Sequence, residues 1–175
     1  MSGFSNVGRN WTVDELKGYL DTIPSPAWGR AVCLHHTAAP SLAQRPLGLL
    51  PQHIENIRDY YIGKNWKAGP HLFADDSFLH GMTPLDRKGI HAVSFNGSAI
   101  GIEVLGDYDR ECPVTSRGLH CWRNAAGAAA AILKWLGIGI TEKTVLFHRE
   151  DPQTDKTCPG QLVSKPWIME LIRQA

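Results

Sequence analysis

Three short apolar runs constrain the fold of this chain more than any other feature of its sequence. They are AVCLH at 31–35, AIGIEVL at 99–105 and TVLF at 144–147. A nearly continuous apolar run of this length is typical of a strand that is buried on both faces of a sheet. We therefore expect a sheet with an apolar interior, which helices must cover.

Helical patterns lie between and after these runs. The strongest spans 116–136, where apolar residues from Leu119 to Leu136 share one face and Gly137 occupies the position of a C-terminal cap. Near the start of the chain, Thr12 and Glu15 have the spacing of a capping box, which predicts a helix start. The other predicted helices cover 12–22, 51–62 and 166–173.

Two further segments, 71–74 and 77–80, flank a pair of aspartates, and this pattern predicts a β-hairpin. Strands and helices alternate loosely, without an internal repeat or a linker. The sequence therefore predicts an α/β fold, a central mixed β-sheet flanked by helices in a single domain. In this prediction residues 1–30 form an N-terminal helical segment packed on the core, and residues 31–175 form the main domain, which carries the candidate functional residues.

Composition excludes several classes of partner. The chain has 175 residues, 43% of them hydrophobic, and a formal net charge of +1, so it lacks the basic excess of nucleic-acid-binding proteins. No apolar stretch approaches the roughly 18 residues of a membrane span, and the first residues, MSGFSNVGRNW, lack the apolar region of a signal peptide. We expect a monomer that is synthesised in the cytoplasm and binds neither nucleic acid nor membrane.

Two of the predicted strands end in a histidine. His35 ends the first run, His148 follows the last, and Cys158 comes ten residues after His148. Two imidazoles and one thiolate are good zinc ligands, and three protein ligands leave a fourth position open for water, as in catalytic zinc sites. On spacing alone, the simpler interpretation is that the histidines are unrelated polar residues and Cys158 is a buried thiol.

Several motifs around these residues occur together in one order. They are LHHTAAP, then HAVSFNGSA with IGIEVLGDYD, then FHRED with KTCPG, and they extend from Ala31 to the C-terminal region. This set resembles the zinc-dependent N-acetylmuramoyl-L-alanine amidases of type 2, a family that includes small phage lysozymes, muropeptide-recycling amidases and peptidoglycan recognition proteins. The resemblance implies one Zn²⁺ per chain, held by His35, His148 and Cys158, and a peptidoglycan or muropeptide substrate.

The resemblance also implies roles for three residues around the metal. His36, Thr37 and His91 would contact the substrate or line its cleft. Cys33 is a rival ligand, because strand alternation puts its side chain on the same face as that of His35. We expect Cys33 to be a core thiol instead.

A second acid/base group is expected beside the metal. One branch of the family carries a tyrosine before the motif that reads GPHLF here, but this chain has Pro70. The recycling branch carries a glutamate in the strand that corresponds to IGIEVLG, and Glu103 occupies that position. A lone carboxylate in an apolar strand is costly to bury unless it is paired or used in chemistry. The alternative is an outward-facing glutamate on an edge strand.

The implied reaction is hydrolysis of the amide that joins the lactyl group of N-acetylmuramic acid to L-alanine. Glu103 would transfer the proton, and Lys156, which the resemblance places two residues before Cys158, would stabilise the negative oxygen of the intermediate. We expect a phage-type endolysin that acts on the cell wall. The alternatives are a muropeptide-recycling amidase, a non-catalytic peptidoglycan-binding module, and a cysteine peptidase with Cys158 as nucleophile and His148 as base. The sequence leaves open whether Cys112 and Cys121 form a disulfide.

Overall fold

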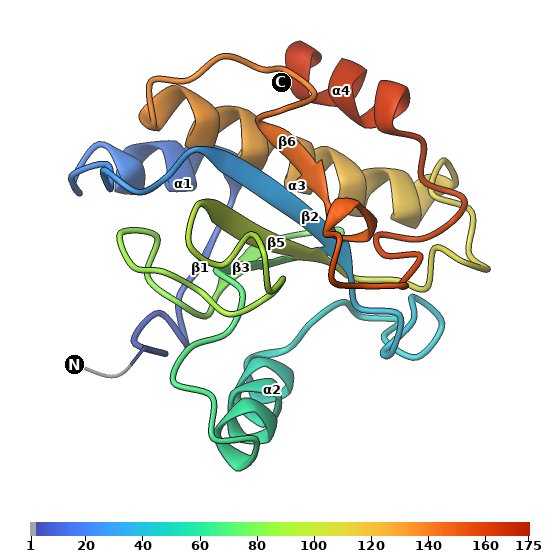
Figure 1. The fold of residues 1–175 in the computed structure, drawn as a ribbon. Helices are drawn as coiled ribbons and strands as arrows, with labels where there is room; N and C mark the ends of the chain where they lie inside the picture. Colours follow the sequence, from blue (N-terminus) through green and yellow to red (C-terminus); the bar gives the residue numbers. More distant parts are fainter. Residues whose placement is uncertain (1–2) are drawn as a thin grey trace.

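The computed structural model describes residues 3–175, and its six strands form one mixed sheet (Figure 1). Strands β3, β5, β2 and β6 are parallel neighbours, β4 is antiparallel to β3, and β1 is antiparallel to β4. The strands are β1 (Asn10–Trp11), β2 (Ala31–His36), β3 (Leu72–Ala74), β4 (Leu79–Gly81), β5 (Ala99–Val104) and β6 (Val145–Phe147). The predicted mixed sheet and the hairpin, β3 to β4, are confirmed.

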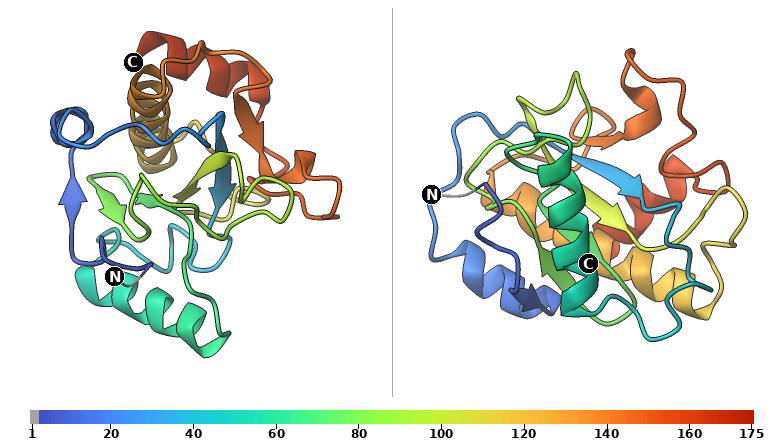
Figure 2. Two further views of the ribbon diagram at one scale, coloured as in Figure 1. Left: turned by 60° about the vertical axis from the view of Figure 1, so that its left-hand side comes forward. Right: turned by 90° about the horizontal axis from the view of Figure 1, so that it is seen from below.

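Four helices cover the sheet unevenly. Helices α1, α3 and α4 lie together on one face, whereas α2 stands on the other side, separated from them by the sheet (Figures 1 and 2). They are α1 (Val13–Leu20), α2 (Pro51–Gly63), α3 (Ser116–Trp135) and α4 (Lys165–Gln174), each close to its predicted range. No helix in residues 3–175 is long and apolar enough to cross a membrane.

The predicted helix ends are present in detail. The Glu15 N–H donates to Thr12 Oγ1 over 3.3 Å, and the Thr12 N–H donates to Glu15 Oε2 over 2.7 Å, which completes the capping box before α1. After α3, Gly137 has a φ of +69°, the left-handed conformation that ends helices at glycine. Local sequence signals therefore set these two helix boundaries.

Strand β1 was not predicted from the sequence. It forms the edge of the sheet by pairing Asn10 and Trp11 with β4, and two residues are too few to show a periodic pattern. In the same N-terminal segment, α1 packs on α3 and places Leu16 and Leu20 in the main core.

The two faces of β2 have different surroundings. Val32 and Leu34 belong to the main core with α3, whereas Ala31 and Cys33 pack with Ala92, which comes from the loop between β4 and β5. Residues alternate between the two faces of a strand, so His35 lies on the same face as Cys33. The loop at 89–98 covers the start of this face and leaves the end of β2 free to form a site.

Asp75 connects the β3–β4 turn to the loop before α2. Its carboxylate accepts hydrogen bonds from the backbone N–H groups of Leu49, Ser77 and Phe78 and lies 3.1 Å from His80 Nε2. Burial alone would raise the pKa of Asp75, but these hydrogen bonds outweigh it and hold the pKa below its ordinary value of 3.8.

Replacing Asp75 with alanine is expected to lower the free energy of unfolding by about 3 kcal/mol at neutral pH, because several buried donors lose their acceptor. The folded-state pKa is depressed, so this stabilisation is present above about pH 4 and is lost as the pH falls through the folded-state pKa. Urea denaturation at several pH values measures the difference. Asp14→Ala is the control, because its pair with Lys17 is exposed and contributes about 0.5 kcal/mol or less. Equal stability of the two variants at neutral pH would contradict the prediction.

Candidate active site

The parallel strands β5, β2 and β6 end at the same edge of the sheet and open into a cleft of about 780 Å³. Loop segments that follow β2 and precede α4 form part of its wall, and α2 forms another part. Every site residue predicted from the sequence lines this cleft: His35, His36, Thr37, His91, Glu103, His148, Lys156 and Cys158.

Three possible metal ligands converge at one end of the cleft. Nδ1 of His35, the penultimate residue of β2, lies 3.1 Å from Nδ1 of His148, which begins the short turn η1 (His148–Glu150) after β6. The Sγ atom of Cys158 lies 3.7 Å from the same His35 nitrogen. All three side chains are buried, and their ligand atoms lie within 4.8 Å of one another.

Burial sets the protonation of these groups. It lowers the pKa of both His35 and His148 below the ordinary histidine value, so both imidazoles are neutral at pH 7. Burial also raises the pKa of the Cys158 thiol, although the backbone N–H of His36 donates to Sγ over 3.4 Å and favours the thiolate. Neutral imidazoles have the lone pairs that metal binding requires, and the thiol has to lose its proton when a metal binds.

Glu103 faces the same centre from the neighbouring strand. The parallel register pairs Glu103 of β5 with His35 of β2, and Glu103 Oε1 lies 3.9 Å from His35 Nδ1. Burial raises the pKa of Glu103 to about 8, against the opposing effect of the Lys156 charge. Because β5 lies between β3 and β2, the alternative of an outward-facing glutamate on an edge strand is wrong.

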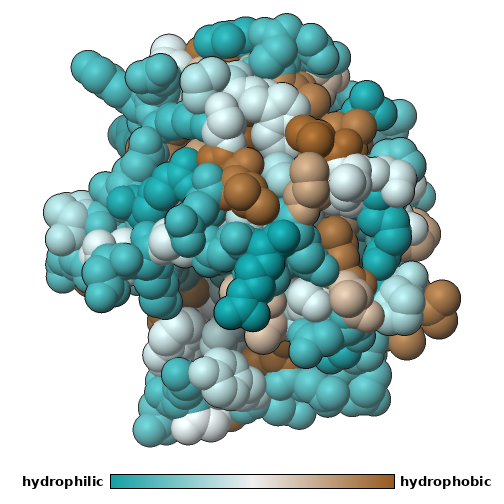
Figure 3. Space-filling view, turned by 90° about the vertical axis from the view of Figure 1, so that its right-hand side faces the viewer, coloured by the Kyte–Doolittle hydropathy of each residue, from teal (hydrophilic) through white to brown (hydrophobic). Residues whose placement is uncertain are grey.

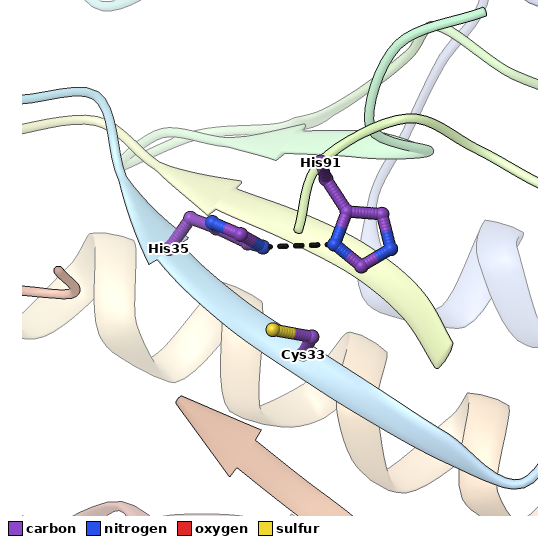
Figure 4. Close-up of side chains that lie close together, drawn as sticks. All are labelled: Cys33, His35 and His91. Atoms are coloured by element: carbon purple, nitrogen blue, oxygen red, sulfur yellow. Dashed lines mark hydrogen bonds between the residues drawn. The ribbon is translucent and has the colours of Figure 1, made fainter. Parts of the chain in front are cut away.

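The other ring nitrogen of His35 faces a second group of side chains. His35 Nε2 lies 3.0 Å from Nδ1 of His91, and Cys33 Sγ lies beside both rings (Figure 4). Cys33 and His35 project from the same face of β2, as strand alternation predicts, and His91 reaches them from the loop above β5. Cys33 is fully buried and lies outside the lining of the cleft.

His36 and Thr37 hold the surrounding loops. The Tyr108 N–H donates to His36 Nδ1 over 3.1 Å. The Thr37 hydroxyl donates to the Pro40 carbonyl over 2.6 Å and accepts from the Gly106 N–H over 3.0 Å. Both residues therefore hold neighbouring loops in place by hydrogen bonds, and both also line the cleft.

One wall of the cleft contains residues that sequence reasoning missed. Tyr61 of α2 stacks on Trp66 with ring centroids 5.0 Å apart, and burial together with nearby Glu103 raises the pKa of the Tyr61 phenol. The helical pattern of α2 predicted the helix but gave no indication of which side faces the cleft. Other wall residues from this region are His53, Asn56, Ile57, Tyr60 and Lys64.

The four cysteines are free thiols. Cys112 is exposed and Cys121 is buried in α3, so the disulfide that the sequence left open is not formed. Cys158 alone among the four lines the cleft.

The strand ends of the mixed sheet gather two histidines, a cysteine and a largely buried carboxylate in one cleft, an arrangement that could hold a metal ion beside a proton-transfer group. The family model for N-acetylmuramoyl-L-alanine amidase matches residues 25–161, and the chain belongs to this family. The sequence matches none of the curated proteins with which it was compared.

Solved structures share this fold at low sequence identity. LysCS, an endolysin N-acetylmuramoyl-L-alanine amidase from Clostridium intestinale, superposes with a TM-score of 0.63 and 20% identity over 83% of this chain and 84% of its own. LysC from the same organism gives 0.65 and 18% over 83% and 86%, and Drosophila PGRP-LB gives 0.61 and 19% over 79% and 77%. The fold and the family that the sequence motifs predicted are confirmed.

Proposed function

We propose that this chain is a zinc-dependent peptidoglycan amidase of the endolysin type. It would hydrolyse the amide between the lactyl group of N-acetylmuramic acid and the L-alanine of the stem peptide. The observation that carries the proposal is the His35, His148 and Cys158 group, which lies next to the largely buried Glu103 in an open cleft. Family membership supports the reaction, and endolysin relatives of the same fold support the biological class.

The spacing of the three ligand atoms fits zinc. Zn–N distances near 2.0–2.1 Å and a Zn–S distance near 2.3 Å in a tetrahedron place two nitrogens about 3.4 Å apart and nitrogen and sulfur about 3.6 Å apart. The corresponding distances here are 3.1 Å and 3.7 Å. One Zn²⁺ per chain, bound by these residues, would leave a position open towards the cleft.

The protein groups around this position would each perform a different part of the reaction. A bound zinc ion supplies Lewis acidity and lowers the pKa of a coordinated water to about 7. Glu103 takes the proton from the attacking water and returns it to the departing amine, a pair of transfers that one positioned carboxylate can perform. The Lys156 ammonium lies close enough to lower the pKa of Glu103 and stabilises the negative oxygen of the intermediate. His36, Thr37 and His91 would line the bound substrate.

A polar substrate agrees with the surface at this side of the molecule. On the face seen in Figure 3, hydrophobic residues form small separate patches within a mostly hydrophilic surface. Glycan strands and short peptides are recognised by polar and aromatic groups rather than by a large apolar area. We also propose that the chain acts on the cell wall as a monomer.

Specific observations bear on two alternative functions, a non-catalytic binding module and a cysteine peptidase. PGRP-LB shares the fold, which keeps a non-catalytic binding module as the second candidate, although this chain retains all three ligand residues and Glu103. A cysteine peptidase needs a nucleophile with a depressed pKa, whereas burial raises the pKa of the Cys158 thiol. The amidase proposal therefore agrees best with the chemistry of the cleft.

Digestion of intact cell walls is expected to release free L-alanine amino termini and to leave the glycan strands uncut. Mass spectrometry of the products and a reducing-sugar assay measure the two results. Soluble muropeptides assayed in parallel separate an endolysin, which would act on intact walls, from a recycling amidase, which would prefer the soluble substrate. New reducing ends without free alanine would contradict the proposed reaction, and binding to walls without cleavage would support the non-catalytic alternative.

A further inference from the structure

The direction of the hydrogen bonds of His91 follows from the chemistry of its partners. Its Nε2 lies 3.1 Å from the Ala99 carbonyl oxygen, which can only accept, so His91 Nε2 carries the proton and donates. In a neutral imidazole with a proton on Nε2, Nδ1 has a free lone pair. That nitrogen lies 3.0 Å from His35 Nε2, so the contact is a hydrogen bond when His35 donates from Nε2.

The consequence reaches the other end of the His35 ring. A neutral imidazole has one proton, and with that proton on Nε2, the lone pair of His35 is on Nδ1. Nδ1 is the nitrogen that faces His148 and Cys158. A chain of two hydrogen bonds therefore runs from the Ala99 carbonyl of β5 through His91 to His35. It ends at the group formed by His35, His148 and Cys158.

The backbone of β5 is shaped to hold this arrangement. A Cβ atom at Gly101 would lie 2.5 Å from Cγ of His91, so the imidazole rests directly on the glycine backbone. His91 is also held at its own backbone, because the side chain of Asn96 accepts hydrogen bonds from the N–H groups of His91 and Ala92. Glycine in the middle of a strand costs stability, and at position 101 it permits the close approach of the His91 ring.

We propose that His91, in addition to lining the cleft, is a positioning residue that fixes His35 in the tautomer with its lone pair on Nδ1. The inference rests on the proposed zinc function and goes beyond it by assigning the hydrogen-bond partner of one ligand, His35. Outer hydrogen-bond partners of metal-ligating histidines orient the ring and raise ligand basicity, and their loss typically weakens metal affinity by about 10- to 100-fold.

Two substitutions of nearly equal shape separate the hydrogen bond from simple packing. In His91→Asn, the side-chain oxygen lies near the place of Nδ1 and still accepts from His35. In His91→Leu, a side chain with the same branching at Cγ offers no acceptor. We expect His91→Leu to bind zinc about 10- to 100-fold more weakly than the unmodified chain in a chelator competition assay, and His91→Asn to recover most of that affinity. Gly101→Ala should act in the same direction as His91→Leu by displacing the ring.

The tautomer itself can be measured in the metal-free protein. Nitrogen-15 NMR of the imidazoles is expected to find His35 protonated on Nε2 in the unmodified chain and in His91→Asn, and a shift of protonation towards Nδ1 in His91→Leu. This readout does not depend on amidase activity. If the unmodified chain bound no zinc, the proposed function would fail, whereas the NMR result would still decide the positioning role of His91.

Three outcomes would overturn the inference. One is a proton on His35 Nδ1 in the unmodified, metal-free chain. Another is equal zinc affinity of folded His91→Leu and His91→Asn, with folding checked by circular dichroism. The third is a second zinc equivalent that Cys33→Ser removes, because a metal held by Cys33 and His91 would make His91 a ligand and not an acceptor. Under the proposal, Cys33→Ser keeps the zinc content and affinity of the unmodified chain.

Discussion

Alanine in place of His35, His148 or Cys158 is expected to remove zinc and amidase activity together. Each variant leaves two protein ligands, too few to hold a catalytic zinc tightly, and the water is no longer activated at neutral pH. Metal analysis of the purified variants, combined with release of L-alanine amino termini from cell walls, measures both effects on the same samples. The expected loss is the largest of any single substitution proposed here.

The control for these variants is Cys33→Ala. Cys33 is as deeply buried as the ligands but lies outside the cleft, so this variant should keep one zinc per chain and its activity. Cys158→Asp separates the metal from a thiol nucleophile, because a carboxylate can bind zinc but cannot replace an attacking thiolate. Stoichiometric zinc in all three alanine variants would refute the proposed ligand set.

The second large effect is expected for Glu103→Gln. The amide keeps the shape of the side chain but cannot accept a proton, so turnover should fall by about 10²- to 10⁴-fold while zinc content is unchanged. Single-substrate kinetics with a soluble muropeptide, together with metal analysis, measures this separation of chemistry from metal binding. Near-normal turnover with normal zinc would reject Glu103 as the acid/base group.

Lys17→Gln provides a matched surface control for Glu103→Gln. Its ammonium pairs with exposed Asp14 on α1, on the side of the sheet opposite to α2, and it does not line the cleft. A similar loss of turnover in this variant would indicate an effect on stability rather than on proton transfer. Thermal unfolding of both variants completes the comparison.

The proximity of His35, His148 and Cys158 could be predicted from the sequence only when the strand ends and the surrounding motifs were taken together. His35 and His148 each follow an apolar run, and the ends of neighbouring parallel strands meet at one edge, so their proximity followed from the strand pattern. The resemblance of the surrounding motifs then selected Cys158 as their partner. The helices were predictable for a similar local reason, since caps and apolar faces are read from adjacent residues.

The relation between His91 and His35 was not predictable in the same way. The two residues are 56 positions apart, and the loop that carries His91 has no periodic pattern that would locate it above β5. The sequence motif indicated a cleft residue, whereas the position of the ring depends on the close approach at Gly101. The pairing of Glu103 with His35 likewise depends on the register of β5 against β2. The register cannot be predicted from the sequence of strands that are apolar on both faces, because such strands lack polar alternation.

Helix α2 buries few of its residues in the fold but lines the cleft. Its residues can therefore affect substrate recognition with little effect on folding. Within α2, Ile54 is the one buried residue, whereas Tyr60 and Tyr61 line the cleft. Substitutions at exposed positions change stability little, typically by about 0.5 kcal/mol or less. We therefore expect that substitutions on the exposed, cleft-facing side of α2 can change substrate recognition while the ligand group and the sheet remain unchanged.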